Sequence, residues 1–101
     1  TAVICANDSM ALGAIRRFNK AGKRVPDDIT IIGFDDIEVA SQVEPALTTI
    51  AAPINEIATR SVDMLLQLAQ GKEIQNQHIA LPAKMIIRQT SSELSKNNAA
   101  A

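Results

Sequence analysis

The sequence contains very few of the residues on which several classes of functional site depend. Its 101 residues include one cysteine, one histidine, two phenylalanines, and neither tryptophan nor tyrosine. Because Cys5 has no second cysteine to pair with, an internal disulfide is excluded, which favours the reducing cytoplasm over a disulfide-stabilised secreted module. Cys5 lies in an apolar run, and His78 is the only histidine. These two residues cannot assemble a zinc site, and we interpret both as structural.

A long apolar run, a dominant charge and a glycine-rich loop are also missing. No apolar run is long enough to cross a bilayer, so a membrane protein is not expected. The formal net charge is −1 at pH 7 and the four glycines are scattered, which argues against a phosphate-tracking surface and a phosphate-binding loop. Aromatic residues make up only 2% of the chain, so we interpret its one basic cluster as a solvated helix face rather than a nucleic-acid patch. This cluster consists of Arg16, Arg17, Lys20, Lys23 and Arg24.

The first third of the sequence has the pattern of a strand, a helix and a second strand. Residues 1–6 form a short apolar run that is typical of a buried strand. Apolar residues then recur at helical spacing after Asn7 or Asp8, either of which can cap the helix, and Gly22 marks the end. A second apolar strand is expected at residues 29–34. Such a βαβ unit predicts an α/β fold with a parallel sheet and a right-handed crossover.

The rest of the chain predicts one long helix and several short elements. Residues 37–42 are expected to form a short helix or turn, and residues 46–53 a strand. Apolar positions recur at helical spacing over residues 54–69, between a proline and a glycine, which predicts an amphipathic helix. Residues 78–89 predict one or two strands interrupted at Pro82.

Short polar side chains follow both strands of the predicted βαβ unit. They are Asn7 and Asp8 after the first strand, and Asp35 and Asp36 after the second. A helix cap or a turn is a sufficient explanation for any one of them, because amides and carboxylates accept hydrogen bonds from backbone N–H groups. In open parallel sheets, however, ligands bind at the carboxyl ends of the strands. If Asn7 and Asp35 converge there, an amide and an acceptor-only carboxylate suit a neutral polyhydroxylated ligand.

Four aspartates could also be considered as a metal site or an acid–base pair. Asp27, Asp28, Asp35 and Asp36 lie close together in the sequence, but their spacing matches no calcium loop or hydrolase pattern. Turn-forming acids are therefore favoured, and neither a metal nor a cofactor is expected. An enzyme is also disfavoured, because the sequence offers no nucleophile with a paired base.

Four motifs occur in the order and spacing of one protein family. The segments "TAVICANDSMALGAI", "GKRVPDDITIIGFDDIEVA", "PALTTIAAP" and "LPAKMIIRQTS" resemble the effector-binding domain of the lactose and galactose repressor family, from Thr1 to about Ser91. Periplasmic sugar-binding proteins of transport systems share "NDSMALGA" and "GFD" but usually lack the combination of "VPDDI" and "PALTTI". The repressor branch is therefore preferred, with the transport receptor as the alternative.

The resemblance implies a partial domain of known architecture. The fold would be a parallel-sheet, Rossmann-like lobe of a periplasmic-binding-protein-like (type I) structure, with an effector bound between two lobes. Residues 1–91 would be the C-terminal part of this effector-binding domain, crossing between lobes near residues 51–53 and 80–82. The helix at residues 54–70 would pack toward the absent N-terminal lobe, and residues 92–101 would be a disordered tail. Because the chain begins at Thr1 directly in a strand-like run, we expect a fragment or a processed product.

The resemblance also implies partners and site residues. A small effector, such as a sugar, would control operator DNA binding by an absent N-terminal helix-turn-helix domain, in a homodimer of the bacterial cytoplasm. Asn7 and Asp35 match the family's contacts to effector hydroxyls, with Asp8 as the helix cap beside the site. Leu12 and Val43 match dimer contacts. The family often has a ligand-contacting glutamine where this chain has Ala52, and sometimes a stacking aromatic residue where it has Ile54, so the effector is not named by the motifs.

Overall fold

The computed structural model describes residues 1–93, which divide into two compact units. Unit 1 comprises Thr1–Ala51 together with the chain from Lys84 onward, and unit 2 comprises Ala52–Ala83. Most of the tail expected at residues 92–101 lies outside the described residues.

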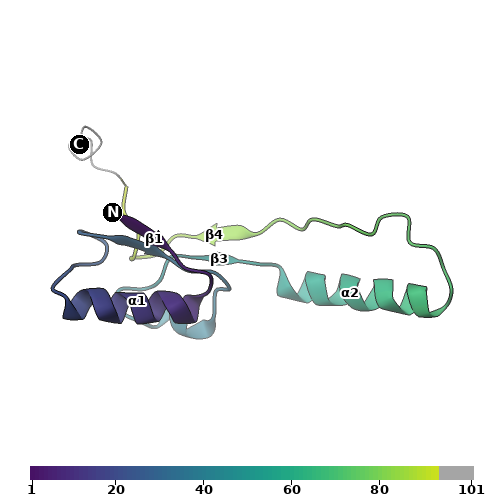
Figure 1. Cartoon of the computed structure of the whole chain (residues 1–101), viewed down its shortest axis with the longest axis horizontal. Helices are drawn as coiled ribbons and strands as arrows, with labels where there is room; N and C mark the ends of the chain where they lie inside the picture. The colour runs from purple at the N-terminus through teal and green to yellow at the C-terminus, as the bar shows by residue number, and fades with distance from the viewer. Residues whose placement is uncertain (94–101) are drawn as a thin grey trace. The chain divides into compact units, whose positions relative to one another are not determined.

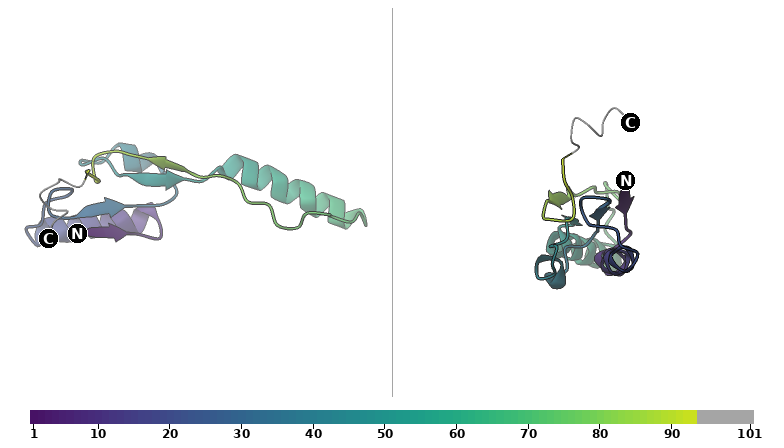
Figure 2. Two further views of the ribbon diagram at one scale, coloured as in Figure 1. Left: turned by 90° about the horizontal axis from the view of Figure 1, so that it is seen from above. Right: turned by 90° about the vertical axis from the view of Figure 1, so that its left-hand side faces the viewer.

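Unit 1 begins with the expected βαβ arrangement. Strand β1 (Ala2–Ile4) is followed by helix α1 (Asp8–Lys20) and strand β2 (Thr30–Ile32), and the two strands pair in parallel with Val3 opposite Ile31. Helix α1 runs along the pair of strands (Figure 1; Figure 2). Beyond its last turn, Gly22 adopts a φ of 75°, a left-handed conformation that suits glycine after a helix end. The α/β fold with a parallel sheet is confirmed.

The second half of unit 1 adds a short helix and two antiparallel strands. The 3-10 helix η1 (Glu38–Ser41) forms where a short helix or turn is expected. Strand β3 (Thr49–Ala51) pairs antiparallel with strand β4 (Lys84–Ile86), with Ile50 opposite Met85. A single parallel bridge between Ile32 and Thr48 connects this ladder to the end of β2. Each strand is shorter than the apolar run that predicts it.

The core of unit 1 is small and lies between α1, β2 and the start of β3. Its buried apolar members are Cys5, Ala11, Ile15, Ile31, Ala40 and Leu47. The prediction that the first strand is buried is wrong, since 75% of Ile4 is exposed. In the described part of the chain, β1 pairs with β2 along one edge, and no second strand borders it. Burial of this strand requires neighbours that residues 1–93 do not provide.

Unit 2 consists of helix α2 (Ile54–Ala69) and the extended segment that follows it. The helix has the bounds that the periodicity predicts and is followed by Gly71 with a φ of 76°. The chain then runs back alongside α2 (Figure 1), and helix and segment together line a hollow of about 320 Å³. Of the one or two strands expected over residues 78–89, one forms, β4 after Pro82, and residues 78–81 before the proline are irregular.

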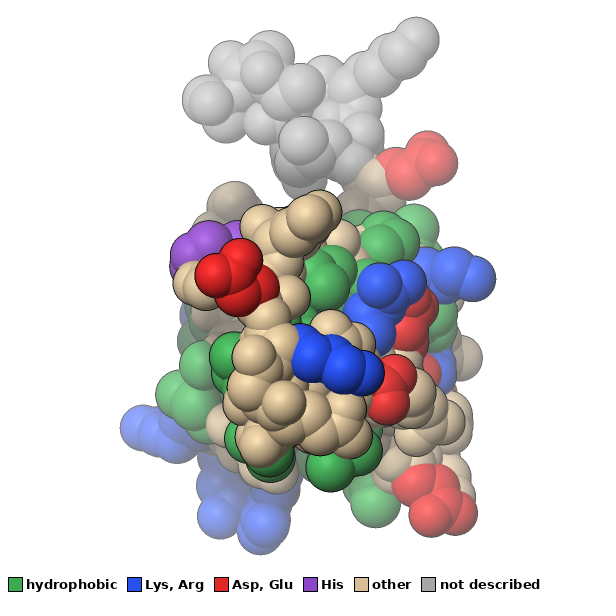
Figure 3. All heavy atoms as spheres, turned by 90° about the vertical axis from the view of Figure 1, so that its right-hand side faces the viewer, with side chains coloured by type: hydrophobic (Ala, Val, Ile, Leu, Met, Phe, Trp, Pro, Cys, Tyr) green, Lys and Arg blue, Asp and Glu red, His purple; other side chains and the backbone are tan. Residues whose placement is uncertain are grey.

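The apolar stripe of α2 is exposed within unit 2, since no residue of the helix is buried. Its larger side chains have exposed fractions of 41% to 64%; they are Ile54, Ile57, Val62, Leu65, Leu66 and Leu68. Figure 3 shows apolar side chains at the surface interspersed with acidic and basic ones. No helix within the described residues is long and apolar enough to cross a membrane.

Candidate functional site

The first side chain of the site lies at the start of α1, where it caps the helix. Asn7 is the N-cap residue, with extended backbone, and its Oδ1 accepts a hydrogen bond from the backbone N–H of Met10 at 2.8 Å. The prediction that Asp8 caps the helix is therefore wrong. Cap geometry requires a non-helical residue whose side chain reaches the amide three positions on, and Asp8 is already the first helical residue. Asn7 remains half-buried, and its NH₂ group donates no hydrogen bond within residues 1–93.

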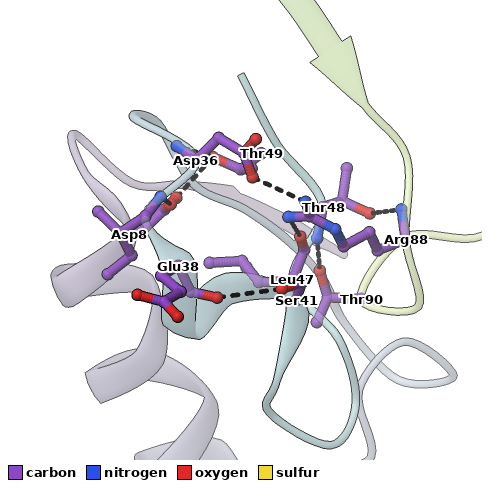
Figure 4. Close-up of polar contacts among 10 residues, drawn as sticks. Asp8, Asp36, Glu38, Ser41, Leu47, Thr48, Thr49, Arg88 and Thr90 are labelled. Carbon is purple, nitrogen blue, oxygen red and sulfur yellow. Dashed lines mark hydrogen bonds and ion pairs between the residues drawn. The ribbon is translucent and has the colours of Figure 1, made fainter. Parts of the chain in front are cut away.

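Asp8 lies inside the protein and holds the loop after β2. Its side chain is fully buried. One carboxylate oxygen accepts from the backbone N–H of Ile37 at 2.9 Å, and the other accepts from the hydroxyl of Thr49 at 2.5 Å. The backbone N–H of Asp8 donates to the carbonyl of Phe34 at 2.9 Å. Figure 4 shows Asp8 directed toward Thr49 at this end of the sheet.

The loop after β2 presents Asp35 in an unusual backbone conformation. Asp35 and Asp36 have φ angles of 110° and 52°, in the left-handed region that residues other than glycine rarely adopt. The backbone N–H of Asp35 donates to the carbonyl of Ile50 at 2.9 Å, which fixes the main chain against β3. The side chain of Asp35 is exposed and makes no hydrogen bond or ion pair in the described part of the chain. It is an acceptor available to a ligand.

Asp36 and Arg88 form the most enclosed ion pair of the described residues. The guanidinium of Arg88 lies 2.8 Å from the Asp36 carboxylate, and their side chains are 19% and 28% exposed. Arg88 also donates to the carbonyl of Leu47 at 3.1 Å, and its backbone N–H donates to the hydroxyl of Thr48 at 2.9 Å (Figure 4). These contacts connect the segment after β4 to the loop that carries Asp35.

The sequence interpretation missed Arg88, Thr48 and Thr49 as supporting residues. Thr49 and Arg88 lie 41 and 52 positions from the residues they contact, Asp8 and Asp36. Local pattern carries no information about such partners. The only usable signal was that "LTT" combines two hydroxyl side chains with a strand that ends in the predicted ligand region.

Leu12 and Val43, the two predicted dimer contacts, lie at the same surface hollow. Both side chains are partly buried against the core, and both line one surface hollow of about 380 Å³. Helix α1 supplies Leu12 and Arg16 to this hollow, and the turn after η1 supplies Val43 and Glu44.

Of the two residues interpreted as structural, Cys5 lies in the core, whereas His78 lies at the surface. Cys5 is buried, and burial raises the pKa of its thiol, which disfavours the reactive thiolate. His78 is exposed in unit 2. Asp28 accepts hydrogen bonds from the backbone and guanidinium of Arg24, as expected of a turn-forming acid. Within residues 1–93 no group of three metal-ligating side chains is found.

Comparison with known proteins places the chain in a family. Residues 1–91 match the periplasmic binding protein-like domain. The repressor PurR of Vibrio campbellii, described as HTH-type, is 38% identical over 94 residues, which are 93% of this chain and 28% of that protein. A crystal structure of the Lac repressor dimer bound to operator and the anti-inducer ONPF is 43% identical, with a TM-score of 0.81 over 90% of this chain and 32% of that one.

A third similar protein was solved with a sugar. The transcriptional regulator of Enterococcus faecium with bound ribose is 37% identical, with a TM-score of 0.80 over 94% of this chain and 35% of that one. The chain therefore spans about a third or less of the length of each relative. The matched domain and these relatives show that the chain belongs to the periplasmic-binding-protein-like domains of the lactose and galactose repressor family of transcriptional regulators.

Proposed function

We propose that this chain is the part of a transcriptional repressor that binds a small polyhydroxylated effector, with Asn7 and Asp35 as the contacts to its hydroxyl groups. The observations that carry the proposal are the exposed carboxylate of Asp35 and the NH₂ group of Asn7, both of which are unpaired within residues 1–93. One hydrogen bond, from the N–H of Asp8 to the carbonyl of Phe34, joins the residues next to them.

The chemistry of the pair favours a neutral ligand with several hydroxyl groups. A carboxylate accepts only, so it can take protons from two adjacent hydroxyls in charge-assisted hydrogen bonds. The amide NH₂ of Asn7 donates to a ring or hydroxyl oxygen, while its Oδ1 is already used by the helix cap. The relative solved with ribose carries a ligand of this class. A transport receptor is not favoured, because the similar proteins are described as repressors or regulators of transcription.

Unit 2 contributes to the proposal as a piece of a second lobe. Six large apolar side chains of α2 are exposed on the apolar stripe, which supports packing of α2 against an N-terminal lobe outside this chain. The unit boundaries at residues 51–52 and 83–84 support the crossovers expected near residues 51–53 and 80–82. We expect this chain alone to self-associate or to be marginally stable. A monomer with a sharp unfolding transition that is independent of concentration would contradict this expectation.

The mechanism follows from differential binding. An effector that prefers one arrangement of the lobes shifts the population of the regulator toward it, and this changes how the operator-binding domains of a dimer are held. Leu12 and Val43, which line one hollow, would lie at the dimer contact.

The experiment that tests the proposal measures effector binding and operator binding separately. The full-length regulator is titrated with ribose, galactose and cellobiose in a thermal-shift assay, since a ligand at 100 times its Kd stabilises the native state by about 2.7 kcal/mol. Asp35→Ala should abolish this shift and leave the affinity for an operator selected from random duplexes unchanged. Asp27→Ala, at an exposed acid outside the site, is the matched control. A normal sugar-induced shift in Asp35→Ala would refute the assignment.

A further inference from the structure

Asp8 forms hydrogen bonds on both sides of Asp35 and Asp36, the two strained residues in the loop after β2. Its backbone N–H donates to the carbonyl of Phe34 at 2.9 Å, and its carboxylate accepts from the N–H of Ile37 at 2.9 Å. The residues between these two points are Asp35 and Asp36, which have φ angles of 110° and 52°. Non-glycine residues keep such conformations only where their surroundings impose them.

The carboxylate of Asp8 is itself held without freedom to move. It is fully buried, and its second oxygen accepts from the Thr49 hydroxyl on β3. Gly33 packs so closely that an added Cβ would overlap Asp8 Oδ1 and lie 3.1 Å from Leu47 Cδ2. The side chain therefore joins three elements in one fixed geometry: the start of α1, the loop after β2, and β3 (Figure 4).

This geometry points to a role that Asp8 does not share with its neighbours. The ion pair of Asp36 with Arg88 and the bond from the N–H of Asp35 to Ile50 hold the loop from the side of the sheet. Within residues 1–93, Asp8 is the only residue at the start of α1 that hydrogen-bonds this loop. We propose that Asp8 is a positioning residue that sets Asp35 relative to Asn7 and so determines effector affinity, an inference that rests on the proposed function of those two residues.

The test compares two substitutions that remove different parts of the contact. Asp8→Ala removes both acceptors, whereas Asp8→Asn keeps one acceptor for the N–H of Ile37 and presents NH₂ to Thr49. In the full-length regulator, the Kd for the tightest-binding sugar among ribose, galactose and cellobiose should be about ten-fold weaker in Asp8→Asn, which corresponds to about 1.4 kcal/mol. It should be weaker still in Asp8→Ala. Asp28→Asn, at a surface acid paired with Arg24, is the matched control and should bind as the parent does.

A second readout separates positioning from a general loss of structure. Hydrogen exchange of the Ile37 amide, measured without ligand, should accelerate in Asp8→Asn, while the amides of α1 and β2 keep their protection. This measurement tests the positioning role of Asp8 even if none of the three sugars binds or Asp8→Ala fails to fold. Unchanged exchange at Ile37, or acceleration throughout unit 1, would overturn the positioning role.

The two proposals fail in different ways. If Asp35→Ala binds sugar normally, the proposed site is wrong. If Asp35→Ala loses binding but Asp8→Asn keeps the parental Kd, the proposed site stands and the positioning role of Asp8 is refuted.

Discussion

Gly33→Ala is expected to destabilise the protein for a steric reason. The added Cβ would overlap Asp8 Oδ1 and would lie 3.2 Å from Asp8 Cγ and 3.1 Å from Leu47 Cδ2. Both neighbours are fully buried, so neither can swing into solvent. The φ of Gly33 lies outside the left-handed region, so the expected loss comes from the clash.

The magnitude follows from the two ways in which the overlap can be relieved. If the core absorbs it, overpacking costs about 1–3 kcal/mol. If Asp8 rotates away, the N–H of Ile37 and the hydroxyl of Thr49 lose a charged acceptor, and such hydrogen bonds contribute about 1.5–3 kcal/mol each. The cheaper route determines the result, so we expect a loss of about 2 kcal/mol in the free energy of unfolding.

Urea unfolding of the full-length regulator, followed by circular dichroism, measures this loss as a lower midpoint with an unchanged m-value. Gly13→Ala is the matched control, because Gly13 lies within α1 and an added Cβ there meets nothing within 4 Å. That substitution should stabilise by about 0.5–1 kcal/mol, since alanine loses less backbone entropy in a helix than glycine. If Gly33→Ala unfolds within 0.5 kcal/mol of the parent, Asp8 is not held as tightly as its contacts indicate.

Three further predictions concern other contacts. Thr90→Val should lower the free energy of unfolding in urea by about 1–3 kcal/mol, because the buried Thr90 hydroxyl accepts from Thr48 N–H at 2.8 Å and donates to the Ile31 carbonyl at 2.6 Å. Thr90→Ser should retain most of the stability. Equal losses in the two variants would contradict the role of the hydroxyl. The pKa of Asp28 is lowered chiefly by its hydrogen bond from the Arg24 side chain, so this pair adds stability above the ordinary pKa of an aspartate and loses it as pH falls through the lowered value; an NMR titration in which Arg24→Gln leaves the Asp28 midpoint unchanged would refute this. Leu12→Glu should shift the full-length regulator from dimer to monomer in sedimentation experiments while Lys20→Glu does not, and a stable Leu12→Glu dimer would place the interface elsewhere.

Elements specified by local pattern were predictable from the sequence. The helix over residues 54–69 has the expected bounds because its apolar periodicity, the preceding proline and the following glycine all act within a few residues. The βαβ order and the short helix before Gln42 follow from local signals of the same kind.

Burial depends on neighbours and was predicted less well. Residues 1–6 have the composition of a strand covered on both faces, yet most of Ile4 is exposed, because β1 borders only β2 within residues 1–93. The contacts of Arg88 and Thr49 with the site could not be predicted for a related reason, since each lies at least 41 positions from the residue that it contacts.

The family resemblance implied that Asp8 caps the helix, whereas the cap is Asn7, and cap preference alone could not have decided between them. Both residue types are good helix caps, so the sequence offers no local reason to choose between them. The choice is made by what surrounds the second position, where two donors, the Ile37 N–H and the Thr49 hydroxyl, converge on a buried side chain. A carboxylate satisfies both, whereas an amide there would direct an NH₂ donor at one of them. At the first position the helix cap uses the amide oxygen of Asn7, and its NH₂ group can donate to a ligand. Asp35, in contrast, can only accept hydrogen bonds from that ligand. Exchanging the two residues would therefore impair the core and remove the donor from the proposed site at once.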